Sequence, residues 1–237
     1  MIELEMRNLA GGEILHAYPQ GKSGSALPCI IFYHGFTSSR VVYSYFAVAL
    51  AEAGFRVIMP DAPEHGARFN GDAAGRLQRF WPILLNSCQG FSALRDAIVQ
   101  QGWLEEGRLA VAGASMGGMT ALGIMTHHPE LTCGASLMGS GYFTSLSRTL
   151  FPSPTFPPEL AEWDVGHQLD KLAAKPLMLW HGEDDDVVPA AESFRLQQAL
   201  KQHGLDGQLT FQWQAGVRHR ITPEALDATV AFFRQTL

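Results

Sequence analysis

The sequence predicts an α/β protein built on a mostly parallel, doubly wound sheet. Five short apolar runs predict its central strands, at residues 29–33, 56–59, 109–112, 135–138 and 177–180. Near-continuous apolar runs of this length suit strands that are buried on both faces of a parallel sheet. Helical patterns lie between the runs, and alternation of strand and helix implies right-handed crossovers with helices on both faces.

Helix signals support this alternation at both ends of the chain. Residues 42–53 carry one apolar face, and Gly54 is the glycine expected to end that helix. Near the C-terminus, Thr222 is a predicted N-cap, and Pro223 occupies the first helical position. A sixth strand is expected at residues 209–214, where apolar and polar residues alternate.

Two regions interrupt this pattern. Residues 2–20 contain two alternating segments around Ala10-Gly11-Gly12, which predict a β-hairpin that forms an antiparallel edge of the sheet. Residues 141–174 are rich in proline and aromatic residues and lie between two central strands, where they could form a short lid over a site. No linker divides the chain, so residues 1–237 are expected to form one domain.

Composition limits the function classes. The net charge is −6 and no run of Lys or Arg occurs, which argues against binding to nucleic acid or to a membrane surface. The charged N-terminal stretch is unlike a secretory signal. Three cysteines without C-x-x-C spacing favour a reducing compartment, and we expect the cytoplasm. The sequence makes no prediction of oligomeric state.

The pentapeptide Gly113-Ala114-Ser115-Met116-Gly117 follows a predicted strand and begins a predicted helix. A reversal this sharp strains the serine backbone and needs small neighbours, and it lifts the hydroxyl above the sheet. The alternative is a serine that only caps the helix. We expect Ser115 to be a nucleophile, because other chemistry-bearing residues also follow strands, at the sheet edge where ligands of α/β proteins bind.

His34-Gly35-Phe36 follows the first central strand. Acyl transfer develops a negative oxygen that needs preorganised donors, and the backbone N–H groups of Phe36 and Met116 are the candidates for this oxyanion hole. The side chain of His34 is interpreted as a core histidine that supports the loop.

The predicted strand at 177–180 leads into His181-Gly182-Glu183 and three consecutive aspartates, 184–186. A serine hydrolase needs a carboxylate that orients its base, but spacing does not choose among the three. They lack the glycine and terminal glutamate of a calcium loop, so no metal site is expected. An acidic helix N-terminus would explain two of them.

His219 lies in a loop between the last strand and the last helix, after the serine and the aspartates. This order of nucleophile, acid and base is typical of folds with a nucleophile elbow, and it predicts His219 as the general base. The other histidines lack such a context; His16, His167 and His203 are expected at the surface.

These motifs resemble the α/β-hydrolase superfamily over nearly the whole chain. The H-G-F turn, D-A-P-E-H-G-A-R at 61–68 and G-A-S-M-G-G are similar to compact bacterial esterases related to dienelactone hydrolases and prolyl oligopeptidases, in particular to the YjfP-type carboxylesterases. The motif H-G-x-x-D-x-x-V-P of that group aligns its acid with Asp185. Dienelactone hydrolases proper have cysteine at the elbow, whereas this chain has Ser115. The group often has glycine before its histidine, where this chain has Arg218.

The resemblance and the residues together predict a serine carboxylesterase that cleaves small carboxylic esters without a cofactor or metal. Esters with short to medium acyl chains are expected as substrates, because the lid is short. Aromatic residues that could border the site are Trp81, Tyr142, Phe143 and Trp163, although core packing would explain them equally well. The alternatives are a thioesterase or acyltransferase, a small peptidase, and a non-catalytic small-molecule binding module on the same fold.

Overall fold

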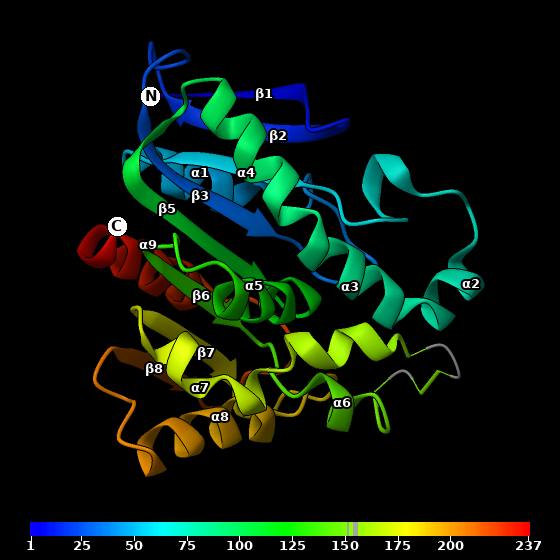
Figure 1. Cartoon of the computed structure of the whole chain (residues 1–237). Coiled ribbons are helices and arrows are strands. Elements are labelled where there is room, and N and C mark those ends of the chain that lie inside the picture. Colours follow the sequence, from blue (N-terminus) through cyan, green and yellow to red (C-terminus); the bar gives the residue numbers. More distant parts are fainter. Residues whose placement is uncertain (151, 154–155) are drawn as a thin grey trace.

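The computed structural model describes residues 1–150, 152–153 and 156–237 (Figure 1). Within these ranges, eight strands form one sheet in the order β1-β2-β4-β3-β5-β6-β7-β8. The strands are β1 (Ile2–Leu9), β2 (Gly12–Pro19), β3 (Leu27–Tyr33), β4 (Arg56–Pro60), β5 (Leu104–Ala114), β6 (Cys133–Leu137), β7 (Leu177–Gly182) and β8 (Leu209–Gln214).

Helices connect the strands. The α-helices are α1 (Ser44–Glu52), α2 (Ala73–Gln78), α3 (Phe80–Gln89), α4 (Phe91–Gln100), α5 (Met116–His127), α6 (Phe143–Leu146), α7 (Leu169–Ala173), α8 (Ala190–Gln202) and α9 (Pro223–Thr236). Short 3-10 helices are η1 (Gly66–Arg68), η2 (Pro158–Trp163) and η3 (Val165–His167). Thr222 caps α9 as predicted, because its side chain accepts a hydrogen bond from the Ala225 N–H.

The predicted fold class is confirmed. Strands β4, β3, β5, β6, β7 and β8 pair in parallel, and β1 and β2 form the predicted antiparallel hairpin at the edge. The predicted runs correspond to β3–β7, although β5 extends to Leu104, where it pairs with Leu27 across an irregularity in the register. The apolar run alone did not reveal that polar first half of β5.

Two hydrophobic cores cover the two faces of the sheet. One core includes residues of α1 and α9, and the other includes residues of α3, α4, α5, α7 and α8. Figure 1 shows α3, α4 and α5 together on one side of the strands, with α1 and α9 on the other. Helices on both faces explain why the central strands are apolar on both sides.

The position of the site follows from the strand order. The chain leaves β3 toward β4 on one side and returns to β5 on the other side of β3. The loops after β3 and β5 therefore diverge, which opens a crevice at the carboxyl ends of these two strands. His34 follows β3 and Ser115 follows β5, so both lie at this switch point.

The prediction that His16 lies at the surface is wrong. His16 is completely buried in β2, where its ring stacks on Trp103 at 4.2 Å. Its Nδ1 lies 3.1 Å from a Glu5 carboxylate oxygen, and its Nε2 contacts the Arg56 guanidinium. Only the pairing of β1, β2 and β4 assembles these partners, so the sequence around His16 gave no sign of its burial.

Buried His16 makes stability depend on pH. Burial, followed by the charges of Arg56 and Arg7, lowers the pKa of His16 to about 3. The unfolded chain takes up this proton near pH 6.5, whereas the folded chain does so only near pH 3. The free energy of unfolding should therefore fall by about 1.4 kcal/mol per pH unit as the pH decreases from 6.5 toward 3.

Urea unfolding at pH 7 and pH 5 measures this effect. We expect His16→Gln to be less stable than the parent at pH 7 but to lose less stability between the two pH values. His203→Gln, which removes an exposed histidine, is the matched control. Parallel pH curves for the parent and His16→Gln would contradict the assignment.

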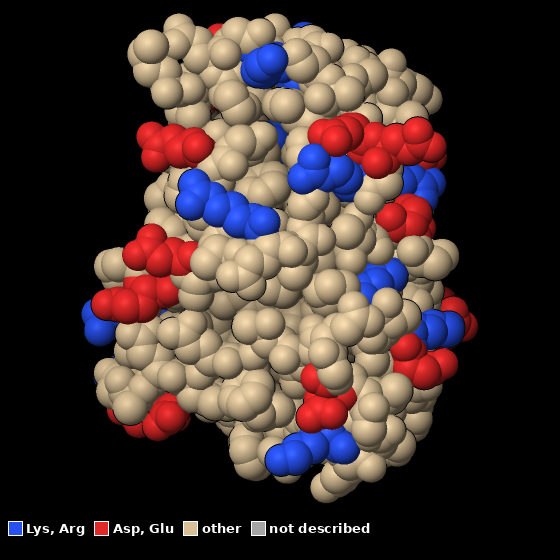
Figure 2. Space-filling model, turned by 90° about the vertical axis from the view of Figure 1, so that its left-hand side faces the viewer, with Lys and Arg blue, Asp and Glu red and all other residues tan. Residues whose placement is uncertain are grey.

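The described residues contain no helix that is both long and apolar enough to span a membrane. Figure 2 shows the end of the molecule at which the parallel strands begin. On this face, acidic and basic side chains are interspersed among uncharged ones, and neither sign forms a continuous field.

Candidate active site

Ser115 occupies the sharp turn between β5 and α5. Its backbone has φ 58° and ψ −121°, a left-handed conformation that is strained for a residue with a side chain. A Cβ on Gly117 would lie 2.0 Å from the Tyr33 carbonyl oxygen, and one on Gly113 would lie 2.3 Å from the Gly117 oxygen. Glycine is therefore required at both positions, as the predicted elbow demands.

The structure brings Ser115, His219 and Asp185 together at the carboxyl ends of the strands. The Ser115 Oγ lies 2.9 Å from His219 Nε2, and His219 Nδ1 lies 2.7 Å from Asp185 Oδ2. Because a carboxylate only accepts, the imidazole proton sits on Nδ1, and Nε2 is left to accept from the serine hydroxyl. This is the tautomer that a general base for Ser115 requires.

Asp185 is fixed by four hydrogen bonds. Its Oδ1 accepts from the backbone N–H groups of Val187 and Val188, both at 2.9 Å. Its Oδ2 accepts from His219 and also lies 3.1 Å from His181 Nε2. Since every lone-pair direction is occupied, the carboxylate has one stable orientation, with Oδ2 toward His219.

These contacts also set the protonation state of Asp185. Burial raises the pKa of the Asp185 carboxyl, but hydrogen bonds from His181, His219 and the Val187 N–H lower it further than burial raises it. The net pKa is well below the ordinary value for aspartate. Asp185 therefore stays ionised through the neutral range and can stabilise an imidazolium at His219.

Asp186, next to Asp185, does not contact His219 and lies at the surface. The Asp186 carboxylate pairs with Arg218 at 3.3 Å, and both side chains are largely exposed. Arg218 is 74% exposed, so its guanidinium lies at the surface beside Asp186. The unusual residue before His219 is thus accommodated outside the crevice.

The two predicted oxyanion residues lie on either side of the crevice. Met116 is the first residue of α5, so its N–H has no acceptor within the helix and lies at the positive end of the helix dipole. Phe36 belongs to the turn after β3, which approaches the elbow closely. A Cβ on Gly35 would lie 3.4 Å from the Ser115 Cβ.

Two buried histidines hold the turn after β3. His34 Nδ1 donates to the Gly35 carbonyl at 2.8 Å, and its Nε2 accepts from the Ala62 N–H at 3.0 Å. His65 Nδ1 donates to the Pro63 carbonyl at 2.7 Å, and its Nε2 accepts from the Thr37 N–H at 3.0 Å. His34 therefore supports the loop, in agreement with the interpretation of its side chain.

His65 is expected to position the oxyanion turn. Burial lowers the pKa of His65 to about 4, so the ring stays neutral and keeps accepting from the Thr37 N–H, next to Phe36. We expect His65→Ala to lower kcat for ester hydrolysis about 10- to 100-fold with little change in KM, because a displaced donor stabilises the transition state less.

Steady-state kinetics of His65→Ala and of the exposed-site control His203→Ala, both checked for folding by circular dichroism, test this role. An unchanged kcat in folded His65→Ala would rule it out. A change confined to KM would indicate a role in substrate binding instead.

A cavity of about 260 Å³ lies beside Ser115 and His219. Apart from these two residues and Thr37, its described lining is apolar and consists of Phe36, Leu77, Phe80, Met119, Leu150, Val187 and Val188. No Lys, Arg, Asp or Glu is among these described residues. The cavity therefore suits an uncharged, apolar group attached to the atom that Ser115 attacks.

The four aromatic residues proposed for the pocket do not line this cavity, and that prediction is corrected. Trp81 and Phe143 are completely buried in the core around α5. Trp163 stacks on His127 at 3.9 Å, and the Tyr142 ring packs under the Arg195 guanidinium at 3.8 Å. Core packing, the alternative considered from the sequence, accounts for Trp81 and Phe143, and Trp163 and Tyr142 stack on partners that do not line this cavity.

Some residues that line the cavity were not predicted from the sequence. Within the segment 141–174, Leu150 lines the cavity, while Leu77 and Phe80 come from α2 and the start of α3. His65 and His181 were missed as supporting residues. Their signal lay in the quoted motifs D-A-P-E-H-G-A-R and H-G-x-x-D, where each histidine lies close to a strand end.

The arrangement can perform nucleophilic acyl transfer. It combines a hydroxyl, a base in the correct tautomer, a buried carboxylate and backbone donors around one crevice. Among the residues that the structure describes, no group of three or more His, Cys, Asp or Glu side chains could hold a metal ion.

Comparisons with known proteins agree with this chemistry. The model of the prolyl oligopeptidase family matches residues 42–237. The chain is 62% identical over 250 residues to Esterase YjfP of Escherichia coli (strain K12), with 100% of both chains covered. It is 31% identical over 255 residues to YitV of Bacillus subtilis (strain 168), again over 100% of both chains.

A solved structure is similar over the whole fold. TT1662 from Thermus thermophilus superposes with a TM-score of 0.84 at 21% identity, and the match covers 99% of this chain and 98% of that chain. The resemblance inferred from the sequence motifs is thereby confirmed.

Proposed function

Because this chain belongs to the prolyl oligopeptidase family of serine hydrolases, we propose that it is a carboxylesterase that cleaves small carboxylic esters through an acyl-enzyme. The hydrogen-bonded series from Ser115 through His219 to Asp185 is the observation that carries the proposal. The identity of 62% to a protein named an esterase supports ester bonds as the target.

Acylation begins at the serine. Ser115 Oγ attacks the ester carbonyl carbon, and its proton passes to His219 Nε2. The resulting imidazolium donates from Nδ1 to Asp185, whose ionised carboxylate stabilises the charge. His219 then returns the proton to the leaving alcohol, and the acyl group remains on Ser115.

The tetrahedral intermediate carries a negative oxygen. We assign its binding to the N–H groups of Phe36 and Met116, supported by the helix start at Met116 and by the proximity of Gly35 to Ser115. Deacylation uses the same groups: His219 takes a proton from water, the water oxygen attacks the acyl carbon, and Ser115 leaves with the proton.

The cavity supports a small acyl group as the preferred substrate. Its volume of about 260 Å³ is below the range of about 300–1,000 Å³ that is typical of sites for drug-sized ligands. Its apolar lining favours aliphatic acyl groups over charged ones. The segment 141–174 contributes Leu150 to one wall, which is consistent with a short lid.

A panel of nitrophenyl esters tests the substrate assignment. We expect kcat/KM for the butyrate ester to exceed that for the palmitate ester at least about tenfold, because the long chain cannot be buried. Leu77→Ala, which removes bulk from the wall, should shift the optimum to longer chains. Faster cleavage of long-chain than of short-chain esters by the parent protein would contradict the assignment.

The same assay can test the other reactions that an acyl-enzyme could undergo or arise from. Adding a competing alcohol distinguishes an acyltransferase, which would form a new ester, from a hydrolase, which would release the acid. Thioester and short peptide substrates test the thioesterase and peptidase alternatives. We expect oxygen esters to give the highest kcat/KM of the three.

We also propose that the enzyme works in the cytoplasm, without a cofactor, a nucleic-acid partner or a membrane partner. Cys29, Cys88 and Cys133 are buried free thiols, which supports a reducing compartment.

A further inference from the structure

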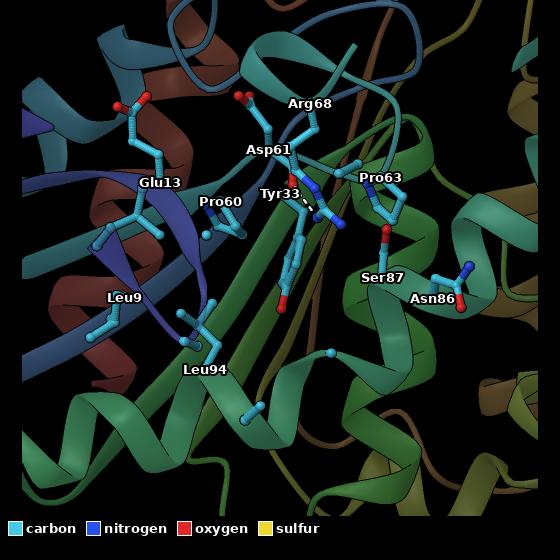
Figure 3. A pocket seen from close by; sticks show the side chains of 16 residues that line it. Leu9, Glu13, Tyr33, Pro60, Asp61, Pro63, Arg68, Asn86, Ser87 and Leu94 are labelled. Atoms are coloured by element: carbon cyan, nitrogen blue, oxygen red, sulfur yellow. Dashed lines mark hydrogen bonds between the residues drawn. The ribbon is translucent and has the colours of Figure 1, made fainter. Parts of the chain in front are cut away.

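A second cavity, with a volume of about 390 Å³, lies apart from the one beside Ser115. It opens to the surface and is lined by the β1–β2 turn, the segment that follows β4 and the junction of α3 with α4 (Figure 3). None of its described lining residues lines the cavity beside Ser115. Its volume is within the range of small-molecule sites, so it can hold a ligand of its own.

One part of this cavity is apolar. Leu9, Ile14 and Leu94 line this part, together with Pro60 and Pro63. These side chains come from the β1–β2 hairpin, from the end of β4 with the loop after it, and from α4, and they offer an apolar surface to a ligand body.

Hydrogen-bond donors converge on another part. Figure 3 shows the Arg68 guanidinium and the Tyr33 ring extending side by side into the space between the labelled residues. Among the described residues, the acceptor for the Arg68 guanidinium is the Asp61 main-chain oxygen, at 3.2 Å, so most of its N–H groups can bind a ligand. Burial raises the pKa of Tyr33, so its hydroxyl keeps its proton and can donate.

The nearby carboxylates do not neutralise Arg68 directly. The Asp61 carboxylate accepts from the Ala67 N–H and from the buried Arg40, both from its backbone N–H and from its guanidinium. Glu13 binds the same guanidinium. Arg40 thus draws both carboxylates toward itself, and Arg68 contacts only the backbone of Asp61.

The start of α4 forms another wall of the cavity. Gly90, Ala93 and Leu94 around its first turn line the cavity, and α4 has no side-chain cap. The last turn of α3 ends at the same glycine and also lines the cavity through Asn86 and Ser87, so the two helix ends bring dipoles of opposite sign and the positive charge at this site comes from Arg68.

From this combination we propose that the cavity is a second binding site, distinct from the catalytic crevice, for a small organic carboxylate with an aliphatic body. The carboxylate binds the Arg68 guanidinium and the Tyr33 hydroxyl near the start of α4. The aliphatic part packs against Leu9, Ile14 and Leu94. Arg–carboxylate pairs are charge-assisted and often bidentate, so they select an acid over an alcohol of equal length.

Isothermal titration calorimetry with hexanoate tests the site on the full-length protein. We expect hexanoate to bind at least about tenfold more tightly than 1-hexanol, and Arg68→Gln to weaken hexanoate binding about tenfold or more. Arg234→Gln is the matched control, because it removes one positive charge from the exposed face of α9 and should leave binding unchanged. Arg68 is exposed, so its replacement should leave the fold intact.

A second variant separates this cavity from the catalytic one. Ala93→Phe should fill the space at the start of α4 and reduce hexanoate binding while Arg68 stays in place. Binding to the catalytic crevice would contribute equally in every variant. Absent binding, equal affinity for hexanol, or a titration that neither Arg68→Gln nor Ala93→Phe changes would overturn the proposal, whatever the esterase assay shows.

Discussion

Replacing Ser115 with alanine is expected to lower kcat for nitrophenyl butyrate by at least about 10⁴-fold. Without the hydroxyl, no acyl-enzyme forms, and only binding and the oxyanion donors remain to assist water. Alanine tolerates the turn about as well as serine, because the strain at φ 58° arises from the Cβ that both residues carry. The fold should therefore persist, and the loss should be in kcat.

Labelling with a fluorophosphonate probe provides a second measurement of the same change. The parent protein should be labelled and Ser115→Ala should not. Ser38→Ala, in the neighbouring turn after β3, is the matched control and should retain both labelling and activity. A well-folded parent protein that neither reacts with the probe nor cleaves esters would favour the binding-module alternative.

Asp185→Asn is expected to lower kcat by about 10⁴-fold for a different reason. Oδ1 accepts two backbone N–H groups, so the asparagine carbonyl must occupy that position. Its NH₂ group then replaces Oδ2 and donates toward His219. His219 has to accept at Nδ1, so its proton moves to Nε2 and faces Ser115, where the ring can no longer act as a base.

The adjacent aspartates provide the control for this variant. Asp184→Asn and Asp186→Asn remove the same charge within one residue of Asp185, but neither carboxylate contacts His219 in the part of the chain that the structure describes. Each should keep kcat within about twofold of the parent value. A large loss of kcat in Asp184→Asn or Asp186→Asn, with kcat retained in Asp185→Asn, would identify that other aspartate as the catalytic acid residue.

The local sequence was sufficient to predict most elements of the fold. Strands β3, β4, β6 and β7 are short apolar runs, and the hairpin of β1 and β2 turns at Ala10-Gly11, directly before Gly12. The turn at Ser115 was also predictable, because only glycine fits at 113 and 117 beside the backbone of β3 and α5. In these cases the signal is local, because the apolar runs and the glycines around Ser115 are neighbours in the sequence, although the atoms that exclude a Cβ at Gly117 belong to β3.

The choice among the three aspartates shows a different limit. Residues 184–186 have the same chemistry and nearly the same position, and the resemblance to known esterases was needed to select Asp185. In the structure, the loop folds so that the Asp185 carboxylate accepts the N–H groups of Val187 and Val188 and faces His219. Asp186 faces outward to Arg218.

By itself, the sequence determined the α/β architecture, the strained serine turn and the order of nucleophile, acid and base. Only the tertiary structure decided that His16 is buried, that His65 holds the oxyanion turn, and that Leu77 and Phe80 rather than Trp81 line the crevice. The physical reason is the sequence separation of the residues that interact. Backbone strain and apolar periodicity act between neighbouring residues, whereas burial, hydrogen-bond partners and cavity walls depend on which distant segments the sheet brings together.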